Sequence, residues 1–428
     1  MHATHRTLIH WRILFASFAV LFLLLLSVGR GDNIPYLKSI AGAYEQDLVR
    51  WEITHFMDKW LVQVAAMVLP GGPTQEERLE NVELFFAMGN DMRDAKAALA
   101  QILAAPHAAD PEPRAVPIQT TIEDLRQRRS KLQAEVEETL ESAMSGVLSD
   151  LRIIDNFGPI SWPPVDFTFE DHGLLLVRSP RDSIARLDDL LLDSNVPVPD
   201  QMQLETDAEG IGTNISALVV RIGGVATYPA QISPERSLHG TLEIAAHEWL
   251  HHWLIFRPLG QRWANGGELQ SINETLANIF GQEVGDLSLG RLTGKVINRP
   301  PWTAPAPQDW NKPSTGIFDF RREMRASRTE LERLLAESTP HAAETYLETR
   351  RLEFVANGYN IRRLNNAWFA FNGTYADSPA SISPIEAQLR NLRTSSPNLA
   401  AYLDSIAAIT KRGQLEVLAR QAGWEPLS

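Results

Sequence analysis

The sequence has no cysteine in its 428 residues. This absence excludes a disulfide framework, a thiol nucleophile and a metal site built on thiolate ligands. It does not fix the compartment, because exported proteins also fold without disulfides.

An excess of positive charge is missing as well. The chain has 40 Lys and Arg residues against 53 Asp and Glu residues, a formal net charge of -13. A surface that binds phosphates needs an excess of Lys and Arg. We therefore expect no nucleic-acid partner.

Long apolar runs are absent after the N-terminus, where residues 13–28 read ILFASFAVLFLLLLSV. This run falls between a bilayer span of about 20 residues and a signal-peptide core of roughly 7–15. Arg6 and Arg12 precede it, a bias that places the N-terminus inside. The pattern predicts a signal anchor over residues 1–30 and a single-pass membrane protein with its catalytic body on the extracytoplasmic side. Cleavage near residues 27–29 is the alternative, and the body is then periplasmic or extracellular.

Apolar periodicity predicts a helical membrane-proximal region over residues 36–151. Its helices are expected at 44–69, 74–105 and 121–151, with a Pro- and Ala-rich linker at 108–117. The third helix has apolar residues spaced by three and four, which is typical of a short coiled coil or of one arm of a helical hairpin. A spacer role is the simpler interpretation, and a helix-mediated partner through residues 121–151 is the alternative.

Strand patterns begin in the next region, residues 157–300. The runs VDFTF and GLLLV between 165 and 177 predict two short strands, and 217–232 predicts a hairpin with Gly223-Gly224 as its turn. Pro229 makes the return arm an edge strand. A helix is expected from Ser233 to just before Pro258, then a Pro-rich loop after 302 and a C-terminal helical subdomain over 301–428. The predicted fold class is α+β, predominantly helical.

The strongest motif lies on that helix and reads His247-Glu248-Trp249-Leu250-His251. Imidazoles at i and i+4 share one helix face and can bind one ion at about 2.0–2.1 Å. Glu248 is rotated by about 100°, so it reaches a metal-bound water and not the ion. A chance HExxH is expected about 0.02 times in such a chain. Arg257 stands where metzincins have their third histidine, which excludes that class.

A second run, 271–281, reads SINETLANIFG. It resembles the third-ligand helix of gluzincins, especially thermolysin-like peptidases, and the resemblance covers about residues 216–285. It implies that Glu274 is the third ligand of one zinc ion per chain. It also implies a zincin-like core, in which a small mixed sheet has its edge strand over the HExxH helix.

The residues themselves give this assignment physical sense. Glu274, Ala277 and Gly281 fall on one helical face, where small side chains let the two helices approach closely. Glu268 or Glu283 as the ligand is the alternative. Asn278 departs from the thermolysin-like pattern, in which an Asp orients the first ligand histidine. A neutral acceptor at this second-shell position predicts a less basic ligand and weaker metal binding.

The resemblance further implies that Glu248 is the general base, and that a donor stabilises the oxyanion. Tyr375, Tyr359 and Arg363 are candidate donors, and packing of the C-terminal helices is the alternative for all three. The return arm, with Val225, Ala226, Thr227 and Tyr228, is the candidate edge strand for an extended peptide.

The sequence therefore predicts a membrane-tethered zinc hydrolase, and a metallopeptidase first. One alternative is a zinc amidohydrolase that acts on a non-peptide substrate of the cell envelope. The other is a non-catalytic, membrane-anchored helical scaffold that retains the zinc fold. Glu248 argues against the scaffold, because a structural site needs no base.

Overall fold

The structure, a computed structural model, describes residues 35–48, 50–52, 54–55, 73–104, 112–157, 160–171, 173–210, 214–300, 302 and 316–426. It is mostly helical with small sheets, which confirms the α+β class. Its N-terminal half comprises α2 (Pro35–Ala41), η1 (Gly42–Tyr44), α4 (Gln75–Ala104), α5 (Glu112–Asp150), β1 (Asp155–Phe157), β2 (Ile160–Trp162), β3 (Phe167–Phe169), β4 (Leu174–Pro180), β5 (Asp188–Leu192) and α6 (Val198–Gly210). Its C-terminal half comprises β6 (Ile215–Arg221), β7 (Gly224–Val225), β8 (Ala230–Ile232), α7 (Leu238–Leu254), η2 (Gly260–Asn265), α8 (Gly267–Thr293), α9 (Phe320–Glu337), α10 (Pro340–Ala356), α11 (Asn366–Asn372), α12 (Ile385–Ser395), α13 (Leu399–Ala407) and α14 (Arg412–Gln421).

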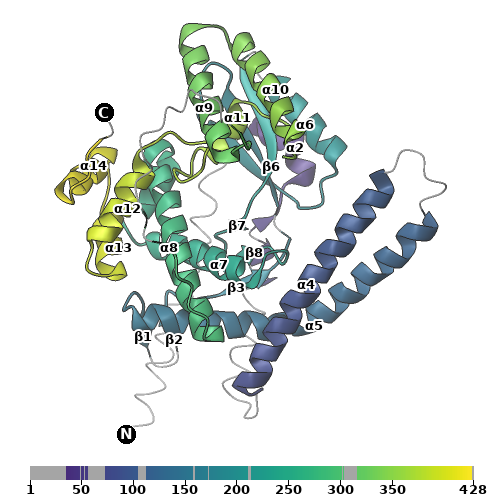
Figure 1. Ribbon diagram of the computed structural model, residues 1–428, viewed down its shortest axis with the longest axis vertical. Helices are drawn as coiled ribbons and strands as arrows, with labels where there is room; N and C mark the ends of the chain where they lie inside the picture. Colours follow the sequence, from purple (N-terminus) through teal and green to yellow (C-terminus); the bar gives the residue numbers. More distant parts are fainter. Residues whose placement is uncertain are drawn as a thin grey trace.

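Helices α4 and α5 form a hairpin whose tip projects from the body (Figure 1). Near the body, Val82 and Val136 belong to the main core, and farther out Met92 and Ile122 form a small apolar cluster. The hairpin-arm alternative for residues 121–151 is thereby confirmed. Helix α5 begins earlier than predicted, so residues 112–117 of the expected linker are helical. Residues 108–111 of that linker lie outside the described residues, as does most of the helix expected at 44–69.

The largest apolar core joins regions that are far apart in sequence. Its buried side chains come from α4 and α5, from α7 and α8 at the centre of Figure 1, and from α12 to α14. Three of the four predicted regions thus contribute to one core. Two smaller cores lie under the sheet of β4 and between α9, α10 and α11.

The described strands form two three-stranded sheets and a two-stranded sheet of β1 and β2, and this arrangement overturns the predicted hairpin over 217–232. Strand β6 pairs antiparallel with β4, from Ile215 opposite Pro180 to Arg221 opposite Leu174, in a sheet with the order β5-β4-β6. Strand β7 instead pairs with β8, which is parallel to β3, in a mixed sheet with the order β3-β8-β7. The two arms of the predicted hairpin do not pair with each other, because β6 pairs with the seven-residue strand β4. Period-two patterning does not identify such a partner.

Helix α5 closes the outer edge of β3 with side chains. Glu141 Oε1 accepts the Phe167 N–H at 2.8 Å, and Glu137 Oε1 accepts the Phe169 N–H at 2.7 Å. Gln133 Nε2 donates to the Phe169 carbonyl at 2.9 Å. Four helical residues rise about 6 Å and two strand residues about 6.6 Å, so a Glu pair at i and i+4 matches alternate strand amides.

Helix α6 closes the outer edge of β6 in the same way. Glu209 Oε1 accepts the Ala217 N–H at 3.0 Å, and Glu205 Oε1 accepts the Val219 N–H at 2.8 Å. Asn365 Nδ2 supplies the matching donor to the Ala217 carbonyl at 2.9 Å. Among the described residues, no further strand pairs with the outer edge of β7.

Helix α7 starts later than Ser233, where the sequence predicted it. Ser237 is the N-cap, and its hydroxyl accepts the Gly240 N–H at 3.1 Å. The preceding loop is tied to the hairpin, because Arg129 donates to the carbonyl of Pro234 at 2.8 Å. That tether holds the loop out of the helix.

The prediction of a single-pass membrane protein is corrected. No helix of the described residues is long and apolar enough to cross a bilayer. The segment on which that prediction depended, residues 1–30, lies outside them, and so does the Pro-rich loop from 303 to 313.

Glu52 gives a test of the packing at Tyr228, which lies between β7 and β8 of the mixed sheet. Its side chain is 3% exposed, Oε1 accepts the Tyr228 N–H at 3.1 Å, and Oε2 has no partner among the described residues. Burial raises the pKa of Glu52 to about 7, with the Tyr228 N–H opposing that effect. A raised folded-state pKa favours the protonated form, so stability falls as pH rises from about 4.5 through about 7.

We expect Glu52→Gln, which keeps the acceptor for Tyr228, to remove this loss. In urea unfolding, the variant should exceed the wild type in free energy of unfolding by up to about 3 kcal/mol at pH 8, and by about 1 kcal/mol or less at pH 5. An equal difference at both pH values would contradict the buried, uncompensated carboxyl.

Candidate metal centre

Helices α7 and α8 lie against each other through glycine. A Cβ at Gly281 would lie 2.5 Å from the Glu243 carbonyl oxygen and 3.3 Å from His247 Cβ, and one at Gly285 would lie 2.8 Å from Glu243 Cγ. Only a glycine fits at such distances, so the two backbones meet directly. This confirms the role predicted for Gly281, and it brings Glu274 of α8 within reach of the HExxH face.

The three predicted ligands converge. His247 Nε2 and His251 Nε2 are 3.1 Å apart, and Glu274 Oε2 lies 3.5 Å from the first and 3.6 Å from the second. Tetrahedral ligands with zinc bonds of about 2.0–2.1 Å are about 3.3 Å apart. The donor set therefore fits a zinc ion with one position left for water.

The alternative ligands are engaged elsewhere. Glu268 pairs with Arg412 at 3.2 Å, and Glu283 pairs with Arg393 at 2.6 Å. Atoms of His247, Glu248 and His251 also come within 4.8 Å of one another. Because Glu274 is closer to both imidazoles, it is the better third ligand.

Neighbouring groups orient the ligands. Asn273 Oδ1 lies 2.9 Å from His251 Nδ1, which holds the ring proton there and leaves Nε2 for a metal. Trp263 Nε1–H donates to Glu274 Oε1 at 3.0 Å, which turns Oε2 toward the histidines. His247 Nδ1 is buried and has no partner within the described part of the chain.

The ligand charges support one another inside the protein. Burial disfavours the charged form of both groups, yet the attraction between Glu274 and the histidines outweighs it. The pKa of Glu274 lies well below its ordinary value, and that of His251 rises to about 9. A proton on His251 therefore competes with a metal ion for the same nitrogen.

Glu248 lies outside the ligand triangle and under the edge strand. A Cβ at Gly224 of β7 would collide with its carboxylate, so this glycine lets β7 lie directly on Glu248. Burial raises the pKa of Glu248, against the opposing effect of His247 and His251. A carboxylate with a raised pKa is a better proton acceptor than an exposed one.

Tyr375 is the one predicted donor that reaches the ligands. Its ring centroid lies 6.4 Å from that of His247, and it lies close enough to Glu274 for that carboxylate to raise its pKa. Burial, with the Glu274 and Glu248 charges, raises the pKa of Tyr375 well above its ordinary value. The hydroxyl therefore keeps its proton and can donate it.

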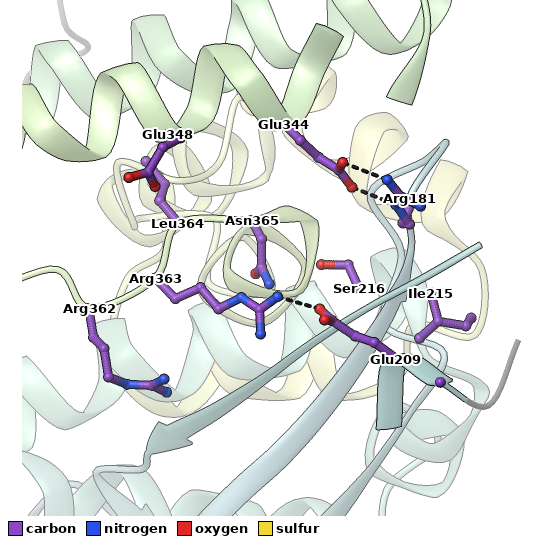
Figure 2. A pocket seen from close by; sticks show the side chains of 11 residues that line it. Arg181, Glu209, Ile215, Ser216, Glu344, Glu348, Arg362, Arg363, Leu364 and Asn365 are labelled. Atoms are coloured by element: carbon purple, nitrogen blue, oxygen red, sulfur yellow. Dashed lines mark hydrogen bonds and ion pairs between the residues drawn. The ribbon is translucent and has the colours of Figure 1, made fainter. Parts of the chain in front are cut away.

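Tyr359 and Arg363 do not join the site. Tyr359 packs among the rings of Phe320 and Phe354, at centroid distances of 4.7 and 6.3 Å. Arg363 donates to Glu209 at 2.6 Å and lines a separate cavity of about 680 Å³ (Figure 2). The predictions for these two residues are wrong, because apolar packing and the carboxylates of α6 hold them.

Asn278 has a different role from the one predicted. Its Nδ2 donates to Asp377 at 2.9 and 3.1 Å, and its oxygen does not accept the N–H of His247, whose Nδ1 has no partner among the described residues. The hydroxyl of Thr275 accepts the Ala376 N–H at 2.9 Å. Both bonds fasten the loop of Tyr375 to the helix that carries Glu274, so Asn278 positions the tyrosine.

The predicted edge strand is shorter than expected. Val225 lies in β7 and Ala226 is exposed, but Thr227 and Tyr228 are buried. His252 donates to the Thr227 carbonyl at 2.8 Å, and burial lowers the pKa of that imidazole to about 4. Thr227 and Tyr228 therefore anchor the sheet and do not face a substrate.

Arg186 was missed by the sequence reasoning, as was Trp263. Arg186 follows β4 in the chain and pairs with Asp189 at 2.5 Å. Burial lowers its pKa, and the charges of Asp189 and Glu274 more than reverse this. No local pattern marks either residue, because Arg186 lies in the loop between β4 and β5 and Trp263 lies in the short 3-10 helix η2.

A second cluster on the same helices, a histidine with two carboxylates, is bound by an arginine. His239 Nε2 lies 2.7 Å from Asp286 Oδ1 and 3.5 Å from Glu243 Oε1. Arg299 contacts both carboxylates. Its guanidinium is the cation of this cluster.

Replacement of Glu274 tests the ligand set. We expect the wild type to hold one zinc per chain and Glu274→Ala to lose it, because two histidines alone do not make a closed site. Metal analysis of the dialysed proteins measures this. Glu268→Ala, on the same helix, is the matched control and should keep its zinc. Unchanged zinc in Glu274→Ala would exclude the assignment.

Asn278 either contacts Asp377 or contacts the first ligand histidine, and these two roles predict opposite results for Asn278→Asp. If it faces Asp377, two carboxylates about 3 Å apart repel, and we expect a lower melting temperature and weaker catalysis with zinc affinity unchanged. The double variant with Asp377→Asn should restore both. Tighter zinc binding in Asn278→Asp would instead support contact with the first histidine.

Comparison of the sequence with models of known protein families found no match. No curated protein and no solved structure matches the chain either. The likeness to gluzincins therefore depends on the residues themselves, namely His247, Glu248 and His251 on α7 with Glu274 on α8.

Proposed function

We propose that this protein is a zinc-dependent hydrolase, and specifically a gluzincin-type metallopeptidase. One observation carries the proposal. Three donor atoms that lie 3.1–3.6 Å apart suit a tetrahedral ion, and the buried carboxylate of Glu248, which is not one of the three, lies beside them. A purely structural site needs four protein ligands and no base. Glu248 is the group that such a site would not require.

The surroundings support a zincin-like core. The HExxH helix and the Glu274 helix are in direct contact, and a mixed sheet presents β7 above Glu248. These are parts that the resemblance implies. The hydrophobic and glycine contacts that hold them belong to the main core of the protein.

When bound, zinc supplies a Lewis acid that polarises the scissile carbonyl and lowers the pKa of a water to about 7. Glu248 takes the proton of the attacking water and later delivers it to the leaving amine. Tyr375, which keeps its proton, donates to the carbonyl oxygen as negative charge develops there. Arg186, close enough to influence the Glu274 charge, supports the electrostatics of the same region.

An extended peptide is the substrate that this geometry favours. A two-residue strand, to which no other described strand pairs on its outer side, lies directly over the base. Main-chain pairing with such an edge binds a peptide regardless of its side chains. The short length of β7 favours unfolded or short substrates, which can reach the edge.

Glu248→Gln separates catalysis from metal binding. We expect kcat for a peptide to fall about 10²- to 10⁴-fold, because an amide cannot accept the proton, while zinc content stays at one per chain. A peptide-library digest read by mass spectrometry measures the activity. Glu243→Gln, one turn before His247, is the control and should keep its activity.

Activity in Glu248→Gln within tenfold of the wild type would refute Glu248 as the base. Zinc-dependent hydrolysis of other amides, with no cleavage of any peptide, would instead indicate an amidohydrolase.

A further inference from the structure

Residues 223–225, the strand β7 with the glycine before it, are called the edge segment here. Arg236 lies at one end of this segment, beside Glu248, the proposed base. It directly precedes Ser237, the N-cap of α7. A Cβ at Gly223 would lie 2.9 Å from its Nη2, so the guanidinium rests against the backbone of that glycine. The next residue, Gly224, rests against the Glu248 carboxylate. The cation and the base therefore lie under consecutive residues of one segment.

The guanidinium of Arg236 has bonding capacity to spare. Its side chain is half-buried, its Nε is buried without a partner, and no oxygen of the described residues accepts a hydrogen bond from it. Burial lowers its pKa, and the charges of Glu248 and Glu243 oppose that effect. A half-buried cation without an acceptor is costly unless a ligand supplies one.

Other partly buried arginines of this protein lack that capacity. Arg178 holds Asp188 through two bonds at 2.7 and 2.8 Å, and Arg362 holds the carboxylate of Glu205. Arg236 has no such carboxylate bound to its guanidinium among the described residues, although it lies at the proposed active site.

Strand direction decides which end of a peptide meets Arg236. The segment runs from Gly223 to Val225, so a peptide paired antiparallel runs from the Val225 side toward Gly223. Antiparallel pairing is the more stable arrangement per residue. It brings the C-terminal part of the peptide to Arg236, whereas parallel pairing would bring an α-ammonium group against a guanidinium.

We propose that Arg236 binds a carboxylate of the substrate one or two residues beyond the scissile bond on its C-terminal side. This inference rests on the proposed peptidase function and deepens it. The carboxylate is either the free C-terminus of a short peptide or an acidic side chain. Arg236 is then a specificity-determining residue, and its bidentate donors suit the carboxylate geometry.

The test uses the zinc-loaded full chain and a set of peptides in three forms. The forms are a free C-terminus, a C-terminal amide, and an amide with Glu as the last residue. For the wild type we expect kcat/KM to be about 10- to 100-fold higher with the free terminus than with the plain amide, mainly through KM. Recovery by the Glu amide identifies an acidic side chain as sufficient, and its failure identifies the α-carboxylate.

Arg236→Gln should lower kcat/KM for the free-terminus peptides to the level of their amides. Arg236→Lys should keep part of the preference. The matched control is Arg93→Gln, which removes the bond to the Glu235 carbonyl in the same loop and should keep the full preference. Equal kcat/KM for free and amidated peptides in the wild type, or a preference that survives Arg236→Gln, would overturn the inference.

Binding separates this inference from the proposed function. Labelled peptides are titrated against Glu248→Gln, with and without Arg236→Gln, and followed by fluorescence anisotropy. We expect the free terminus to bind about tenfold or more tightly than the amide, and only when Arg236 is present. If the wild type cleaves no peptide, the proposed function fails, and this difference still decides the inference. Equal binding of the free-terminus and amidated peptides, or no binding of either, would contradict a carboxylate site at Arg236.

Discussion

The direct contact between α7 and α8 is the constraint on which the rest of the structure depends. A glutamate side chain is short, so its carboxylate meets two imidazoles on another helix only if the two backbones nearly touch. Gly281 and Gly285 permit this, and a methyl group at either would strike the main chain or side chain of Glu243. Burial of the HExxH face follows from the same contact, and with it the low-dielectric setting in which Glu274 and the histidines interact strongly.

Helix α8 then does two things with one set of adjacent residues. Glu274 faces the histidines, while Thr275 and Asn278 hold the loop that carries Tyr375. Ligand and donor are thereby fixed relative to each other by bonds to a single rigid element. Such an arrangement limits the reorganisation that a developing charge would otherwise require. The edge strand is placed by equally local means, because His252 on α7 binds the Thr227 carbonyl just past it.

The parts that could be predicted from the sequence are those set by helical periodicity. The spacing of His247 and His251 puts two nitrogens on one face, and Glu274 shares a face with Ala277 and Gly281, so the ligand set follows from two local patterns. Residues outside helices were less predictable. Tyr375, Tyr359 and Arg363 were equal candidates for the oxyanion donor, because no local sequence pattern indicates which loop lies at the site. The hairpin prediction over 217–232 failed for a similar reason, since β4, distant in sequence, competes for β6 as a partner.

The glutamate pairs that close β3 and β6 have a consequence for how this protein behaves among its own copies. An unpaired strand edge accepts any extended chain, whether that chain is a ligand or a partly unfolded neighbour. By filling two edges with carboxylates from α5 and α6, the fold leaves β7, two residues long, as the open edge of the mixed sheet among the described residues. At the far edge of the other sheet, Glu45 bridges Leu192 of β5. An edge of the length of β7 is too short to start a growing stack of strands, which takes segments of about six residues. The side chains that complete the sheets therefore also act as gatekeepers against aggregation.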